Sequence, residues 1–130
     1  MVDRHKDFLA VRARAFLASA KADFSRGDYD LVLFHVEQAL QLCLKHLIFT
    51  RLGDFPKTHS LIRLIKDAMK VCDEPSLRDL YEQNLEMIYL LEEAYIASRY
   101  LPHSYDREIA ERALSFGERA LEVLGCLKET

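Results

Sequence analysis

The segment Arg99-Tyr100-Leu101-Pro102-His103-Ser104-Tyr105 carries the residue types best suited to chemistry in this chain. The guanidinium of Arg99 is a permanent cation whose planar donors match a phosphate, and the imidazole of His103 exchanges protons near neutral pH. Tyr100 and Tyr105 add two aromatic rings to the same short stretch. The combination predicts a site for a phosphodiester.

Five predicted helices must position this segment, which joins the last two of them. Apolar residues recur at steps of three and four along the chain, the spacing of amphipathic helices. The predicted helices span residues 3–26, 29–51, 58–72, 76–99 and 106–127. No linker or low-complexity tract divides the chain, so we expect a single all-α domain over residues 1–130, an antiparallel up-and-down bundle with a four-helix core.

The second predicted helix, residues 29–51, is apolar on nearly all sides. Its clear polar stripe consists of Glu37, Gln41 and Lys45, spaced by four residues. Such a helix either occupies the centre of the bundle or is shared with a second subunit. Both alternatives remain open from the sequence.

The three cysteines, Cys43, Cys72 and Cys126, lie far apart and form no C-x-x-C pair. Structural zinc sites need closely spaced Cys or His pairs, so we expect no metal and no cofactor. We interpret all three as buried thiols, which predicts a protein of the reducing cytoplasm. The most apolar stretch, residues 31–49, contains both an acid and a lysine, so we expect no membrane span.

Charge is unevenly distributed although the net value is only −3. Residues 45–70 hold six Lys or Arg against two acids, whereas residues 73–93 hold seven acids against one arginine. The two segments either face each other, within one chain or between subunits, or leave a basic surface that attracts phosphate. The composition is not that of an obvious nucleic-acid-binding protein.

Four pieces of sequence occur in an order and helical setting that point to a known family. They are Gly27-Asp28-Tyr29-Asp30; Phe34-His35-Val36-Glu37-Gln38-Ala39 with Leu44-Lys45; Thr58-His59-Ser60-Leu61 with Leu64; and Tyr95-Ile96-Ala97-Ser98-Arg99-Tyr100. Together these pieces resemble the HEPN domains of prokaryotes, over most of the chain. The resemblance implies a compact helical bundle that forms a homodimer. It also implies a partner, a minimal nucleotidyltransferase of the MNT type, in a two-gene system of toxin–antitoxin character.

The family has two branches with different activities, and the resemblance therefore implies two alternatives for this chain. Some members are metal-independent endoribonucleases whose site pairs an arginine with a histidine, and others are non-catalytic modules that bind nucleotides or partners. By resemblance to the first branch, His103 is the general acid or base at a ribose 2′-hydroxyl and Arg99 stabilises charge on the phosphate. RNA or a nucleotide binds through Arg99 and stacks on Tyr100 or Tyr105.

The match to the ribonuclease branch is partial. Only three residues separate Arg99 from His103, fewer than is usual, and Tyr100 stands where that branch prefers Asn, Asp or His. The ending His103-Ser104-Tyr105 matches one toxin subgroup, which implies Tyr105 as a target of nucleotidyl transfer. Three functions therefore compete: a nucleotide- or partner-binding component, a ribonuclease toxin, and a dimeric helical scaffold.

Structural interpretations compete at each of these residues. Arg99 can neutralise the carboxyl end of a helix, His103 can be a solvated turn residue, and the tyrosines can pack the rim of the bundle. For His59 we favour a structural role at a capped helix start over phosphate binding. We interpret Tyr95 as a core or dimer contact.

Overall fold

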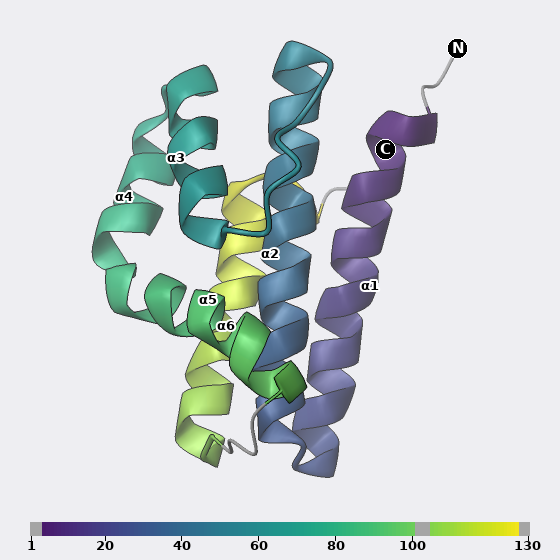
Figure 1. The fold of residues 1–130 in the computed structure, drawn as a ribbon, viewed down its shortest axis with the longest axis vertical. Helices are drawn as coiled ribbons and strands as arrows, with labels where there is room; N and C mark the ends of the chain where they lie inside the picture. Colours follow the sequence, from purple (N-terminus) through teal and green to yellow (C-terminus); the bar gives the residue numbers. More distant parts are fainter. Residues whose placement is uncertain (1–3, 101–104, 128–130) are drawn as a thin grey trace.

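The computed structural model describes residues 4–100 and 105–127, and all side chains there except those of residues 4–6 and 98–99. In this part of the chain six α-helices form and no strand occurs. They are α1 (Arg4–Arg26), α2 (Tyr29–Leu52), α3 (Leu61–Val71), α4 (Pro75–Gln83), α5 (Leu85–Tyr100) and α6 (Arg107–Val123). The helices α1, α2 and α6 run along the long axis, and α5 crosses them obliquely (Figure 1). The predicted all-α fold is confirmed.

The central element of the bundle is α2, which contacts α1, α3, α5 and α6. Most of its apolar residues are buried within this chain, although Leu31 and Leu52 are exposed, so α2 occupies the centre of the bundle, as the first of the two sequence alternatives states. The polar stripe is largely drawn into the core as well, because Glu37 and Gln41 are buried beside Val36 and Leu40. By length and hydropathy α2 also passes for a membrane span, but 56% of its apolar window is buried inside the bundle.

Asn84 divides the helix that the sequence predicts over residues 76–99. Its side-chain Nδ2 donates to the carbonyl of Leu80 at 2.9 Å, and its backbone leaves the helical region at φ −130° and ψ 27°. Asparagine competes with helical hydrogen bonding in this way because its amide reaches nearby backbone groups. The expected fourth helix is therefore two helices, and the obliquely placed second one, α5, carries Arg99.

A disulfide joins Cys43 of α2 to Cys126, with 6.0 Å between the Cα atoms. Beyond α6, the left-handed Gly125 (φ 83°) turns the chain, and the amide of Cys126 donates to the carbonyl of Leu121. The interpretation of three thiols is wrong for this pair, because spacing along the chain does not reveal that the end of α6 returns to α2. Cys72 is a buried free thiol as predicted. The cysteines no longer argue for a reducing compartment.

Candidate functional site

The predicted site residues lie around the connection between α5 and α6. Arg99 belongs to the last turn of α5, but its side chain is outside the described residues, as is the whole of His103. Tyr100 ends α5 with 69% of its surface exposed. Tyr105 is half-buried and packs against the core just before α6. Of the two tyrosines, Tyr100 offers the more accessible ring.

Three aromatic rings from distant parts of the sequence stack one turn before Arg99. Tyr95 of α5 lies between Phe34 of α2, at 6.2 Å and 13° between ring planes, and His59, at 5.7 Å and 16°. We call these three residues the aromatic ladder. Phe34 and Tyr95 are half-buried, whereas His59 is exposed. The ladder therefore ends at a solvent-facing imidazole.

A buried carboxylate supports the backbone of His59. The side-chain amide of Gln41 lies 3.0 Å from the His59 carbonyl oxygen, to which it donates, and it also donates to the carboxylate of Glu37 at 2.5 Å and 3.0 Å. Glu37 is fully buried. This chain of contacts connects the centre of α2 to the start of α3.

A second carboxylate holds the residue after His59. Ser60 is the N-cap of α3, and its hydroxyl accepts from the amide of Arg63 while donating to Glu92 of α5 at 2.6 Å. The same Glu92 oxygen accepts from the amide of Ile62 at 3.3 Å. Glu92 comes from the acidic segment, but its partners here are a hydroxyl and a backbone amide. An ion pair between the basic and acidic segments forms elsewhere, between Arg51 and Glu74 at 3.8 Å.

The support around His59 is electrostatically costly. Burial raises the pKa of Glu37 to about 8; the Glu92 carboxylate adds to this rise, and hydrogen bonds from Gln41 and Gln38 oppose it. Burial also lowers the pKa of Lys45, which the charge of Glu37 partly offsets. Buried ionisable groups rarely add net stability compared with apolar residues of similar size. Their presence behind an exposed residue is a sign of function rather than of core packing.

Tyr105 sits in acidic surroundings. Burial raises the pKa of its phenol, and the carboxylates of Glu93 and Asp30 raise it further. The hydroxyl is therefore protonated at neutral pH and able to donate a hydrogen bond. Asp30 lies one turn before Phe34 of the ladder. The negative charges of Asp30 and Glu93 disfavour a phosphate beside Tyr105.

A separate polar cluster lies between α1 and α2. The buried carboxylate of Asp23 accepts hydrogen bonds from the Nδ1 of His35 and from the guanidinium of Arg26. The imidazole of His35 also contacts the rings of Phe16 and Phe34, at 5.8 Å and 5.4 Å between centroids. This cluster fastens the first two helices together.

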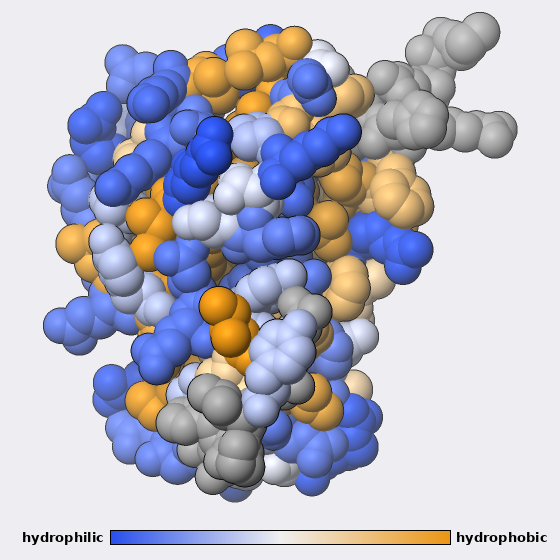
Figure 2. Space-filling view, viewed as in Figure 1, coloured by the Kyte–Doolittle hydropathy of each residue, from blue (hydrophilic) through white to orange (hydrophobic). Residues whose placement is uncertain are grey.

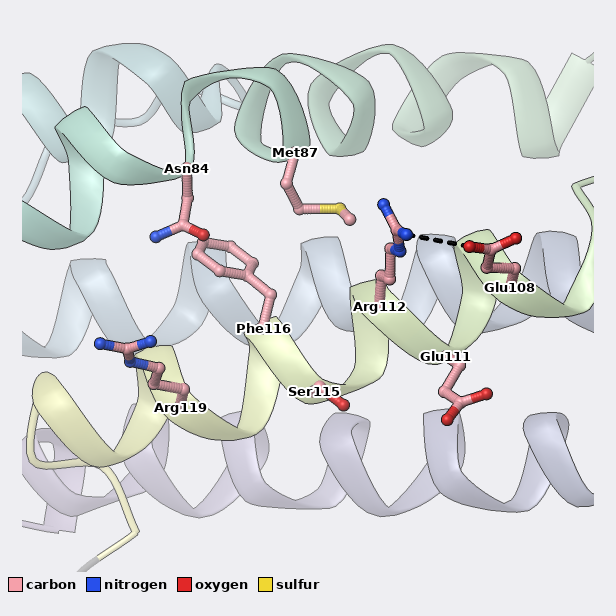
Figure 3. A pocket seen from close by; sticks show the side chains of 8 residues that line it. All are labelled: Asn84, Met87, Glu108, Glu111, Arg112, Ser115, Phe116 and Arg119. Carbon is pink, nitrogen blue, oxygen red and sulfur yellow. Dashed lines mark hydrogen bonds and ion pairs between the residues drawn. The ribbon is translucent and has the colours of Figure 1, made fainter.

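A groove of about 580 Å³ lies at the other end of α5, against α6. Figure 3 shows Met87 and Arg112 pointing into the space between the two helices, with Arg112 paired to Glu108 at 2.9 Å. At 1.5 Å per helical residue, Met87 is about 18 Å along α5 from Arg99. Both partners of the ion pair are exposed, so the groove has no buried polar group to position a ligand. We do not assign the site to it.

The sequence favours structural roles for His59 and Tyr95 and assigns no role to Phe34, and the structure adds all three to the candidate site. The signal that pointed to them is that each belongs to a different piece of the HEPN resemblance. These pieces, far apart in the chain, meet in space beside the last turns of α5. Within the described residues, no group of three or more His, Cys, Asp or Glu is arranged to hold a metal ion.

Comparisons with known proteins show the family and the fold of the chain. Among solved structures, TT1696 from Thermus thermophilus matches with a TM-score of 0.78 and 29% sequence identity, over 95% of this chain and 98% of that chain. A search of curated proteins found no match. A family model described as HEPN domain matches residues 7–127. Because that match spans nearly the whole sequence, the chain belongs to the HEPN domain family.

Proposed function

We propose that this protein binds nucleotides or RNA at the carboxyl end of α5, as the non-catalytic component of a two-gene system with a minimal nucleotidyltransferase. The observation that carries the proposal is the buried support for an exposed residue, His59, whose ring stacks on Tyr95, one turn before Arg99 in α5. Gln41 with the carboxyl group of Glu37 holds the start of α3 against α2, and the carboxylate of Glu92 holds it against α5, at a cost that packing alone does not require.

The residues of this site divide the work of recognition. Arg99 supplies the permanent cation that pairs with phosphate oxygens. The exposed ring of Tyr100 offers a surface on which a base stacks. Tyr105, whose pKa is raised by burial and by the carboxylates of Glu93 and Asp30, provides a neutral hydroxyl group.

We propose further that two copies associate through the outer face of α5. Four large apolar side chains on this helix are exposed: Leu85, Tyr89, Ile96 and Tyr100, the last two at 58% and 69%. Figure 2 shows apolar surface among polar residues over the last turns of α5. A homodimer formed here would cover Leu85, Tyr89 and Ile96, leave Tyr100 at its edge for a base, and bring the carboxyl ends of the two α5 helices toward one cleft. Light scattering should give a dimer for the wild type and a monomer for Ile96→Glu.

The nucleotidyltransferase partner is proposed from family membership and from Tyr105. In this proposal the partner transfers a nucleotidyl group to the Tyr105 hydroxyl, which must lose its proton as the new phosphorus–oxygen bond forms and pyrophosphate leaves. Incubation with ATP, magnesium and a minimal nucleotidyltransferase of the MNT type should add nucleotidyl mass to the wild type but not to Tyr105→Phe. Equal modification of both proteins would contradict the assignment.

Binding itself is tested by titrating the protein with AMP, ATP and a short single-stranded RNA. Arg99→Ala should weaken binding about tenfold or more, since a charge-assisted contact to phosphate is lost. Arg119→Ala, an exposed arginine of α6 near the Figure 3 groove, is the matched control and should bind as the wild type does. Absence of binding by the wild type would leave the dimeric scaffold as the surviving function.

The second candidate function is a metal-independent endoribonuclease. It is favoured by one observation: α5 ends at Tyr100, so Arg99 lies in its last turn and His103 follows within the short connection to α6. Proton transfer by a positioned histidine contributes about 10²- to 10⁴-fold to a rate. Labelled RNA in EDTA should therefore be cleaved by the wild type and left intact by His103→Ala and Arg99→Ala. Equal, trace cleavage by all three proteins would reject this activity.

A further inference from the structure

The aromatic ladder has the form of a stacking platform with one open end. Its three rings come from α2, α5 and the start of α3, and neighbouring planes are tilted by only 13° and 16°. Two of the three rings, Phe34 and Tyr95, are half-buried. The last ring, His59, is exposed and keeps surface available to a fourth ring.

The surroundings of the ladder favour an uncharged ring over an anion. Glu92 lies against the residue after His59, and Asp30 and Glu93 lie beside Tyr105 at the same end of the bundle. A phosphate placed among these carboxylates would be repelled. The amide of Ile62 at the start of α3 already donates to Glu92, and that of Arg63 to Ser60, so these donors are occupied.

We propose that His59 is the base-binding residue of this site: a nucleobase stacks on its exposed ring and extends the ladder of Phe34 and Tyr95. The inference rests on the proposed nucleotide-binding function and assigns its base subsite. The ligand is a nucleotide unit, free or within single-stranded RNA, with its base on His59 and its phosphate directed away from the carboxylates of Asp30, Glu92 and Glu93. Glu37, Gln41 and Glu92 are positioning residues that fix the backbone on either side of the imidazole.

The test uses a fluorescent ring in place of the imidazole. The chain contains no tryptophan, so His59→Trp introduces one reporter at the open end of the ladder. The variant is titrated with AMP, with a short single-stranded RNA, and with ribose 5-phosphate, which has a phosphate and no base. A second variant, Lys57→Trp, places the reporter on an exposed residue two positions away as the matched control.

We expect AMP or RNA to quench the fluorescence of His59→Trp and to leave that of Lys57→Trp unchanged. If RNA quenches and AMP does not, the site binds a base only within single-stranded RNA. If AMP quenches as well, the site also binds a free nucleotide. Ribose 5-phosphate should not quench. His59→Ala should bind the base-containing ligand about tenfold more weakly than the wild type, as expected for one lost base–aromatic stack.

The outcomes separate this inference from the function on which it rests. If the wild type binds AMP or RNA and His59→Ala binds equally well, the base subsite is overturned and the nucleotide-binding function stands. Equal affinity of the wild type for ribose 5-phosphate and AMP would also overturn the base subsite. No binding of any ligand to the wild type would overturn both. Because His59 is exposed, far-UV circular dichroism should show unchanged helix content in each variant.

Discussion

Two histidines of this protein, His35 and His59, each depend on a buried carboxylate, but they use it in opposite ways. Asp23 accepts a hydrogen bond directly from the ring of His35, whose side chain is only 21% exposed. Glu37 instead supports the backbone of His59 through Gln41 and leaves the ring exposed. Because Asp23 binds the imidazole of His35, this ring helps to join α1 and α2. The imidazole of His59 has no such role, because Gln41 binds the backbone carbonyl of His59, and the ring remains exposed for a ligand.

The largest stability effect should come from a bond that lies outside both histidine regions. Replacing Cys43 by Ser removes a disulfide between residues 83 positions apart, which should lower the free energy of unfolding by about 4 kcal/mol. Urea denaturation of the wild type with and without reductant should show the same loss, and Cys72→Ala should remain sensitive to reductant. An unchanged midpoint after reduction would contradict this role of the disulfide.

Removing the carboxylate that binds His35 should lower the free energy of unfolding without changing the affinity for a ligand. Asp23→Ala removes a buried acceptor shared by His35 and Arg26, at a cost of about 3 kcal/mol. Asp23→Asn, which keeps the shape, should cost less. At a temperature where the variant is folded, its affinity for AMP or RNA should equal that of the wild type. A selective loss of affinity would move the functional site toward α1.

The His59 region should give a distinctive pH dependence. The pKa of Glu37 is about 8 in the folded protein and near 4.5 when unfolded, so the folded state binds one proton more between these values. The stability that this proton provides is complete below the lower pKa and is lost as pH rises through the higher one, at up to about 1.4 kcal/mol per pH unit. In Glu37→Gln this slope should disappear, as measured by urea denaturation from pH 5 to pH 8. Parallel curves for the two proteins would show that Glu37 is not buried as described.

The smallest change in the free energy of unfolding should come from removing the ring of His59, and removing the ring of His35 should cost more. His59→Ala removes an exposed side chain and should change the free energy of unfolding by no more than about 0.5 kcal/mol. His35→Ala leaves Asp23 with one buried hydrogen bond fewer and should cost about 1–3 kcal/mol. Thermal denaturation of both variants gives the comparison, and equal losses would erase the proposed division between them.

The sequence predicts the helices of this protein well and the candidate site less well, for physical reasons. Apolar periodicity and the left-handed glycine after Arg26 are local signals, so the bounds of α1 and α2 are predicted within a residue. The break at Asn84 depends on one side-chain hydrogen bond to Leu80, which periodicity does not reveal.

The aromatic ladder depends on the packing of three helices. Phe34, His59 and Tyr95 are tens of residues apart, and each alone is consistent with core packing or a helix cap. The same applies to the disulfide, since an odd number of cysteines does not show which two meet. In both cases the missing information is tertiary, and it is the ring contacts in the structure that bring the three ladder residues together.

The most direct test of the account is NMR of the histidine ring protons during titration with AMP or a short single-stranded RNA, with each resonance assigned from a histidine variant. A stacked base shifts the protons of a ring beneath it, so the His59 resonance should move with the ligand concentration while that of His35 stays in place. A His59 resonance that does not move while ligand binds, or a larger shift at His35, would contradict the proposed division between the two regions.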